Sequence, residues 1–159
     1  MEKIINSDIF KRGLILPDNS LHKIDHWERV EKYGLMISDV CKADKKVVSL
    51  FAYLHDARRI NDSHDPEHGA RAADLLTELL KAKIIELKNK QKNQLIEALT
   101  WHSFVSANSK DVTVQTCWDS DRLDLWRAQI EPDPKMMFTL FGSSKYMINF
   151  AKHLNNINE

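Results

Sequence analysis

Apolar residues recur every three or four positions along most of this chain, and polar residues fill the positions between them. This spacing is typical of helices that bury one face. In the segment 21–40, the apolar stripe consists of Ile24, Trp27, Val30 and Met36. The hydroxyl of Ser20 could cap the first turn, so the pattern predicts a helix that starts directly after Ser20.

Four more helices are predicted from the same spacing. They are expected over residues 44–57, after Pro66, over 91–104 and over 113–130. The stripes of the first three are Val47, Leu50, Phe51 and Leu54; Ala72, Ala73, Leu76, Leu79 and Leu80; and Leu95, Ile96 and Leu99. Pro132 and Pro134 end the last of them, because proline removes a backbone donor. The chain has only four glycines and four prolines, which argues against a β-rich fold with its many turns.

The predicted fold is therefore all-α, with five core helices and short C-terminal helices, in a single domain over residues 1–159. We expect the core over about 20–131, an N-terminal extension over 1–19 and C-terminal helices over 132–159. The apolar segment 136–150 is interpreted as a helix that closes the core, with a dimer contact as the alternative. The protein is expected to be a monomer or a homodimer.

Composition narrows the range of partners. Hydrophobic residues make up 43% of the chain, charged residues 29%, and the formal net charge is zero. Such a chain has no basic field to attract a nucleic acid polymer or an anionic membrane. Its two cysteines do not make a disulfide framework, and no segment resembles a signal peptide or a membrane span, so we expect a cytoplasmic protein.

Two His-Asp pairs occur in different surroundings. His55-Asp56 ends the apolar run FAYL, so it lies at the edge of the predicted core. The pair at 64–65 lies in the polar loop INDSHDP, where a solvated or capping role is the better interpretation. The first pair is therefore the better candidate for a buried site.

Further polar residues share the faces of the apolar stripes. They are His26, His68, His102 and Asp121. A single histidine on an apolar face is usually a core histidine with an ordinary hydrogen-bond partner. Here five predicted helices each turn an imidazole or a carboxylate inward, and burying such groups is costly unless something pairs with them. A divalent cation could satisfy all of them, and the mixed ligands suit Mn, Fe, Co, Ni or Zn better than Ca, with Mg also conceivable.

These residues resemble the pattern of the HD-domain superfamily of metal-dependent phosphohydrolases. The matching segments are IDHWERV with His26, FAYLHDARR with His55 and Asp56, and CWDSDRLDLWR with Asp121. The segments LHD, DPEHGARAA and CWDSDRLDL are most similar to a branch of small single-domain bacterial HD proteins. The resemblance spans about residues 20–131, and it implies metal ligation by His26, His55, Asp56 and Asp121, supported by Asp119 and Asp124.

The resemblance also implies a place for a second ion. His68 and His102 occupy, in order, the positions of additional histidines in binuclear HD proteins, with Asp56 able to bridge. They are either ligands of a second metal or acid–base groups, so His68, His102 and Asp56 are the candidate catalytic residues. Many relatives have paired histidines where this chain has His102-Ser103, so one ion or two are both open. His22, one turn before His26, is expected to be exposed.

Four arginines near these motifs are candidate phosphate ligands. They are Arg58, Arg59, Arg71 and Arg122. Guanidinium groups bind phosphate in a bidentate manner. Neighbouring helical residues point about 100° apart, so only one of Arg58 and Arg59 is expected to face the site. The alternative is that these arginines form structural ion pairs with nearby carboxylates. The four tryptophans are expected to pack around the site.

The predicted function is metal-dependent hydrolysis of a phosphate ester, with a nucleotide or another small phosphorylated molecule as substrate. Phosphomonoesterase activity ranks ahead of pyrophosphate or triphosphate cleavage and of cyclic phosphodiester cleavage. Two other functions stay open, a non-catalytic nucleotide-binding module for signalling and a di-iron oxygenase of the HD type. Neither a nucleic acid polymer nor a membrane is an expected partner.

Overall fold

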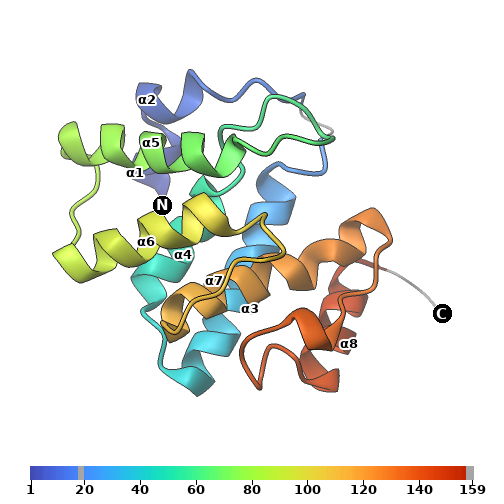
Figure 1. Cartoon of the computed structure of the whole chain (residues 1–159). Coiled ribbons are helices and arrows are strands. Elements are labelled where there is room, and N and C mark those ends of the chain that lie inside the picture. Colours follow the sequence, from blue (N-terminus) through green and yellow to red (C-terminus); the bar gives the residue numbers. More distant parts are fainter. Residues whose placement is uncertain (18–19, 157–159) are drawn as a thin grey trace.

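The computed structural model describes residues 1–17 and 20–156, and it is helical with no strand in that part of the chain (Figure 1). The α-helices are α1 (Glu2–Ile5), α2 (Asp8–Lys11), α3 (Ile24–Cys41), α4 (Lys45–Leu54), α5 (His68–Lys81), α6 (Asn89–Trp101), α7 (Val112–Leu123) and α8 (Lys145–Leu154). Two 3-10 helices, η1 (Asp124–Ala128) and η2 (Pro134–Met136), complete the list. The all-α prediction is confirmed.

The five long helices expected from the sequence correspond to α3–α7, but the residues at which they begin and end differ from the predicted ones. Helix α3 begins at Ile24 and not directly after Ser20, and no side chain caps it. The Ser20 hydroxyl instead donates to Asp62 and accepts the backbone N–H of His22. Ile24 is also 40% exposed, so its expected inward position is wrong.

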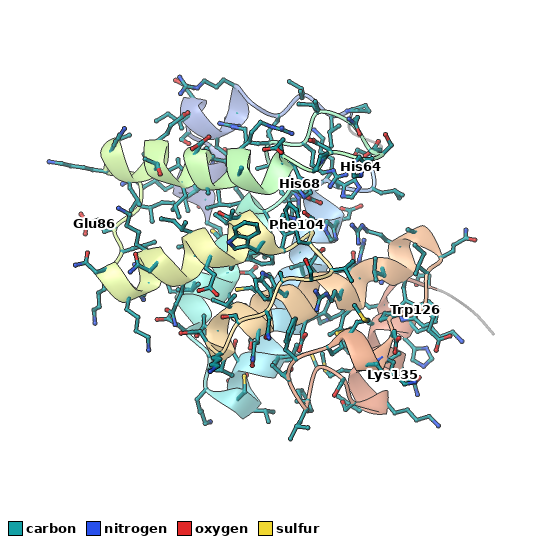
Figure 2. The ribbon with its side chains drawn as sticks, in the orientation of Figure 1. His64, His68, Glu86, Phe104, Trp126 and Lys135 are labelled. Carbon is teal, nitrogen blue, oxygen red and sulfur yellow. The ribbon has the colours of Figure 1, made fainter. Side chains whose placement is uncertain are left out.

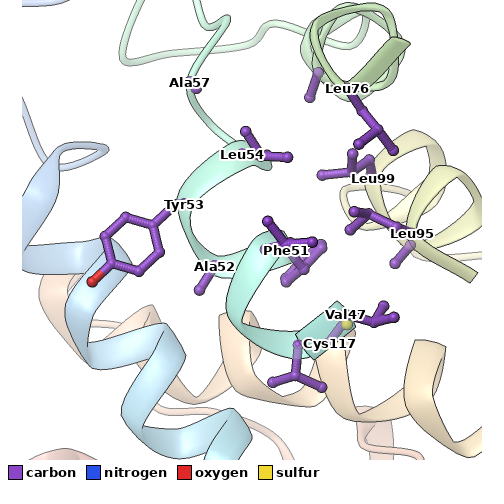
Figure 3. Packing of buried hydrophobic residues seen from close by; sticks show 14 of the residues in the cluster. Val47, Phe51, Ala52, Tyr53, Leu54, Ala57, Leu76, Leu95, Leu99 and Cys117 are labelled. Atoms are coloured by element: carbon purple, nitrogen blue, oxygen red, sulfur yellow. The ribbon is translucent and has the colours of Figure 1, made fainter. Parts of the chain in front are cut away.

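Helix α4 lies at the centre of the fold. Its first turn is capped by the carboxylate of Asp44, which accepts two backbone N–H groups. Figure 3 shows Phe51 and Leu54 facing Leu95 and Leu99 of α6, while Tyr53 points the other way, toward α3. Each such apolar side chain contributes about 1.5–3 kcal/mol when fully buried. Helix α4 is therefore held on both sides, and its C-terminal end is fixed inside the molecule.

The N-terminal segment expected as an extension packs on this core. Phe10 is fully buried and meets the edge of Trp27 at a ring distance of 5.9 Å. The guanidinium of Arg58 donates to the backbone carbonyls of Ile9 and Phe10. Residues 18–19 of the expected extension lie outside the described residues. The short helices α1 and α2 thus complete one side of the core.

Helix α8 closes a second, smaller part of the core. The segment 136–150 was expected to be one such helix, but only its residues from Lys145 onward are α-helical. Met147, Ile148 and Ala151 are buried in one cluster with Tyr33 and Ile37 of α3. No helix in the described part of the chain is long and apolar enough to cross a membrane.

The chain between α7 and α8 is held by one buried carboxylate. Asp119 accepts hydrogen bonds from the backbone N–H groups of Phe138 and Thr139 and from the Thr139 hydroxyl. A side chain at Gly142 would collide with this arrangement, since an added Cβ would lie 2.7 Å from Asp119 Oδ2. This carboxylate therefore has a structural role, as the resemblance implied for a supporting residue.

Candidate metal centre

The His55-Asp56 pair lies where α4 stops. Leu54 is the last helical residue, and the next two residues turn away while remaining buried. The backbone N–H of His55 still bonds to the Phe51 carbonyl, which fixes the turn. The Nδ1 atom of His55 faces the carbonyl of Ala52 at 3.0 Å. The helix end thus directs an imidazole and a carboxylate into the interior from adjacent positions.

Four side chains from three distant parts of the chain meet at this point. His26 Nε2 lies 3.0 Å from His55 Nε2, 3.6 Å from Asp56 Oδ2 and 3.4 Å from Asp121 Oδ1. His55 Nε2 lies 3.5 Å from Asp56 Oδ2 and 3.6 Å from Asp121 Oδ1. Ligands of one ion with bonds of about 2.1 Å and angles of 90–110° lie roughly 3.0–3.4 Å apart. These five distances are close to that spacing, and His26, His55 and Asp121 form a group that could hold a cation, with Asp56 beside both imidazoles.

The tautomers of the two histidines support the same conclusion. Asp124 Oδ2 lies 2.7 Å from His26 Nδ1, and only the carbonyls of Phe51 and Ala52 face His55 Nδ1, so both Nδ1 atoms carry the proton. In their neutral forms the two Nε2 atoms therefore present lone pairs to each other across 3.0 Å. Two facing lone pairs repel unless a proton or a cation lies between them. The donor set fits a divalent metal on chemical grounds.

Asp124, which the resemblance implied only as a supporting residue, holds the ring of His26. Besides His26, it accepts hydrogen bonds from Arg29, Tyr33 and Asn155, and it is fully buried. These contacts lower the pKa of Asp124, although burial acts in the opposite direction. A histidine held by an ionised carboxylate is a stronger metal ligand with a fixed ring orientation.

A second group of three residues lies on the other side of Asp56. His68 Nε2 and His102 Nε2 are 2.7 Å apart, and they lie 3.3 and 3.8 Å from Asp56 Oδ1. Their Nδ1 atoms face the backbone carbonyls of Asp65 and Leu99, so these rings also turn lone pairs toward one point. His68 begins α5 and His102 directly follows α6. These three residues could hold a second ion.

Asp56 thus belongs to both groups, with Oδ2 facing the first and Oδ1 facing the second. Burial tends to raise the pKa values of Asp56 and Asp121, but the surrounding imidazoles hold both well below the ordinary value. Burial and Arg127 oppose protonation of His26, yet hydrogen bonds to Asp121, Asp124 and Asp56 raise its pKa to about 9. Without a metal, the cluster therefore keeps a proton on His26 at neutral pH.

The expectation that His22 is exposed is wrong. Its Nδ1 atom lies 2.6 Å from Asp56 Oδ2, and its side chain is only 13% exposed. The helix α3 begins two residues later, so His22 is not on the helical face inferred from the sequence. The non-helical backbone before Ile24 carries this third imidazole to the shared carboxylate, which periodicity alone could not indicate.

Of the four arginines, one reaches the two groups of ligands. Arg59 Nη1 lies 3.2 Å from His68 Nε2 and 3.5 Å from Asp56 Oδ1, whereas Arg58 points to the N-terminal segment. This agrees with the expectation that only one of the pair faces the site. The Arg71 guanidinium pairs with Asp65, and Arg122 donates to the Met136 carbonyl. The structure does not bring Arg58 or Arg71 to the cluster.

The tryptophans were expected to pack around the site, and this is only partly correct. Trp27, Trp118 and Trp126 are buried, but Trp101 is 48% exposed. Its ring meets the edge of Phe104 at 5.4 Å on the surface. The pattern missed this because Trp101 occupies the last turn of α6, next to a loop.

Several pockets border the ligands, including one lined by His26 and a small one lined by His22 and Asp56. A pocket of about 340 Å³ has Asp121 and His102 among its lining residues, and one of about 230 Å³ includes His68 and Arg59. Ser103 and Phe104 border both pockets. Asp121 is itself 19% exposed, so a small molecule has a route to the centre.

The fold of this chain is similar to that of a protein of known structure. A crystal structure of a predicted HD superfamily hydrolase from an uncultured Thermotogales bacterium matches with a TM-score of 0.69. The match covers 96% of this chain and 85% of the other, at 21% sequence identity. The chain has the HD fold. At this identity the likeness establishes the architecture, which agrees with the fold implied by the sequence motifs.

Comparisons at the level of sequence give nothing further. No protein-family model matches the chain. No curated protein matches it either.

Proposed function

We propose that this protein is a metal-dependent phosphohydrolase that converts a small phosphate ester and water into an alcohol and inorganic phosphate. The observation that carries the proposal is the shared carboxylate of Asp56. It lies between the Nε2 atoms of His26 and His55 on one side and those of His68 and His102 on the other. The Nδ1 atom of His22 also contacts it on the first side. The Thermotogales protein of the same fold is described as a predicted hydrolase, which supports the assignment.

His26, His55, Asp56 and Asp121 would hold the first ion, and Asp56, His68 and His102 would hold the second. Such ions lower the pKa of bound water and compensate charge on phosphoryl oxygens. The contribution of the chain is to keep the ligands in place before substrate arrives. Asp124 fixes His26, and backbone carbonyls fix the other three rings. We propose a transition metal among Mn, Fe, Co, Ni and Zn, because imidazoles outnumber carboxylates in this set.

Arg59 is the proposed ligand of the phosphoryl group. Its guanidinium is buried beside the second group of ligands, and it also donates to the carbonyls of Asn61 and Ser63, which hold it there. The other three candidate arginines are engaged elsewhere, but a further guanidinium, that of Arg127, lies 3.4 Å from His22 Nδ1. We propose phosphomonoester cleavage ahead of cleavage of pyrophosphate or triphosphate, in the order expected from the sequence.

The test uses protein purified without chelator. Bound metal is measured, and phosphate release from p-nitrophenyl phosphate and a nucleotide panel is followed with added Mn, Co, Ni or Mg. We expect metal-dependent release that falls by at least about 1,000-fold in Asp56→Ala, because both ions lose a ligand. Asp74→Ala, an exposed aspartate of α5, is the matched control and should keep full activity.

Two results would contradict the proposal. Tight nucleotide binding without turnover would identify a binding module. Oxygen consumption that requires iron, without phosphate release, would identify an oxidase or oxygenase.

A further inference from the structure

His22 lies closer to the shared carboxylate than any of the proposed metal ligands does. Its Nδ1 atom is 2.6 Å from Asp56 Oδ2, whereas the Nε2 atoms of His26 and His55 are 3.6 and 3.5 Å from the same oxygen. A separation of 2.6 Å is that of a strong hydrogen bond to an ionised group, while the longer separations suit two ligands of one ion. The contact of His22 with Asp56 is therefore of a different kind.

The proton of this hydrogen bond belongs to His22. Burial tends to raise the pKa of Asp56, but the charge of His55 and hydrogen bonds from other imidazoles hold it well below the ordinary value. An ionised carboxylate only accepts hydrogen bonds, so His22 donates from Nδ1. Arg127 Nη2 also approaches Nδ1, at 3.4 Å, but a guanidinium cannot accept, so the shorter contact sets the direction. With its proton on Nδ1, His22 has no lone pair on that atom for a metal, although the atom lies close enough to His26 and Asp56 to share an ion with them.

The backbone that carries His22 is held by two other segments of the chain. The N–H group of His22 donates to the Ser20 hydroxyl at 3.0 Å, and that hydroxyl donates to Asp62 in the loop after α4. From η1, Arg127 Nε donates to the Leu21 carbonyl at 3.1 Å. The irregular segment before α3 is thus fixed on both sides, and it presents the imidazole to the carboxylate in one position.

Figure 2 shows that these two holding segments lie in different parts of the molecule. His64, in the same loop as Asp62, lies near His68 at the start of α5, whereas Trp126, the neighbour of Arg127, lies near α8. Contacts that come from two directions leave the segment 20–22 little freedom to move. A donor that is fixed in this way can orient a metal ligand, which a mobile donor cannot do.

A donor on Oδ2 decides which way the carboxylate of Asp56 faces. Each carboxylate oxygen has two lone pairs, so Oδ2 can accept from His22 with one and bind the first ion with the other. Oδ1 then stays 3.3 Å from His68 Nε2 and 3.8 Å from His102 Nε2, beside the place of the second ion. Arg59 Nη1 attracts Oδ1 only across an ion-pair distance of 3.5 Å. Without His22, the carboxylate could therefore rotate and offer both oxygens to the first ion.

We propose that His22 is a positioning residue that keeps Asp56 as a bridge between two ions, because its hydrogen bond to Oδ2 prevents the carboxylate from binding the first ion with both oxygens. This inference rests on the proposed two-metal function and concerns how many ions the protein holds, not its substrate. It gives a role to a side chain outside both groups of ligands. Binding of the second ion thereby depends on a residue that lies beside the first.

The test compares two substitutions of His22 by calorimetric titration of the metal-free protein with Mn. His22→Leu removes the donor, so affinity for the second ion should fall about 10–100-fold, the usual effect of losing a partner of a metal ligand. The first ion should lose less than about three-fold, because both oxygens of Asp56 can then reach it. His22→Asn offers an amide N–H near the position of Nδ1 and should keep the affinity for the second ion within about three-fold. Ser20→Ala, which frees the backbone of His22, should weaken the second ion about two- to five-fold.

Electron paramagnetic resonance of the Mn-loaded protein gives a readout that a general loss of stability would not produce. Two Mn ions joined by a carboxylate are spin-coupled, and we expect this coupling in the unaltered protein and in His22→Asn. His22→Leu at the same Mn concentration should show the signal of isolated Mn. The matched control is His153→Leu, which replaces an exposed histidine of α8 and should leave both ions and their coupling unchanged.

Three results would overturn the inference. They are a His22→Leu variant that keeps the coupled ions, equal losses of the second ion in His22→Leu and His22→Asn, and an unaltered protein that binds only one ion. If His22→Leu does not fold, an unchanged second ion in Ser20→Ala overturns it instead. The expected metal behaviour in a protein that hydrolyses no phosphate ester would support the role of His22 and contradict the proposed function, so the two proposals fail in distinguishable ways.

Discussion

The two halves of the centre share Asp56 but are built differently. The first half has two imidazoles and two carboxylates, and its His26 is fixed by the buried, ionised Asp124. The second half has two imidazoles and one carboxylate oxygen, its rings are fixed by neutral carbonyls, and the Arg59 guanidinium lies 3.2 Å from His68. More negative charge and one more ligand favour the first ion, while a guanidinium lies near each half, Arg127 near the first and Arg59 near the second. We therefore expect one tightly bound ion and one weakly bound ion.

The largest expected difference comes from removing one ligand from each half. Asp121→Ala should weaken binding of the tight ion by more than about 100-fold. This exceeds the usual effect of removing a residue that only hydrogen-bonds to a metal ligand. His102→Ala should remove the weak ion and leave the tight one in place. Calorimetric titration of the metal-free protein with Mn or Zn measures both sites. Equal losses at both sites in the two variants would show that the halves do not differ.

Asp124→Asn tests whether the charged anchor of His26 is the source of the difference. Loss of an outer carboxylate typically costs about 10–100-fold in metal affinity, so we expect this at the first site only. Arg29 would also lose its buried partner, so the free energy of unfolding should fall by about 3–5 kcal/mol. Tyr33→Phe removes one hydrogen bond to the same carboxylate and serves as the milder comparison.

The pH dependence should also distinguish the halves. His26 has its pKa raised to about 9 in the metal-free protein, so an ion must displace a proton from it below that pH. Affinity at the first site should therefore rise about ten-fold from pH 7 to pH 8. Titrations in two buffers of different ionisation enthalpy count the released proton. A pH-independent first site would contradict this prediction.

The raised pKa of His26 also makes the stability of the metal-free protein depend on pH. Because the folded pKa of His26 lies above the unfolded value of 6.5, its contribution is fully present below pH 6.5 and is lost as the pH rises through 9. The loss amounts to at most about 3 kcal/mol. Denaturant unfolding at pH 6.5 and 9 should show it in the metal-free protein and not in the metal-loaded one.

The smallest expected effect concerns the cation of the second half. Arg59→Gln should strengthen binding of the weak ion by about two- to ten-fold, since a positive charge near its ligands is removed. It should also lower kcat/KM for phosphate esters. Arg58→Gln is the matched control, because that guanidinium holds the carbonyls of Ile9 and Phe10 and should affect only stability. If Arg59→Gln leaves metal affinity at the second site unchanged, the Arg59 charge does not weaken binding of the second ion.

The sequence was most informative where a polar residue shares a face with an apolar stripe. His26, His68 and Asp121 were predicted in this way, and their helices bring His26 and Asp121 to the first group of ligands and His68 to the second. The exact end of α4 could not be predicted, because helix termini depend on tertiary packing. The turn after Leu54 directs Arg59 inward and Arg58 outward, which a continuous helix to residue 57 would not have specified.

The parts that the sequence did not reveal depend on irregular backbone. The approach of His22 to Asp56 comes from the non-helical segment before α3, and periodicity carries no information there. The short helices α1 and α2 have too few turns to produce a clear pattern. The pocket beside Asp121 and His102 combines the loop after α6 with residues of α7, η1 and η2, so its shape follows from packing that only the structure shows.

Crystals grown with manganese test the central claim most directly, through anomalous diffraction at the metal edge. We expect two ions about 3.5–4 Å apart. Asp56 would bind one with each carboxylate oxygen, and the ion beside His26, His55 and Asp121 would have the higher occupancy. An ion at this place that does not contact Asp56, or full occupancy on the His68 and His102 side alone, would contradict it.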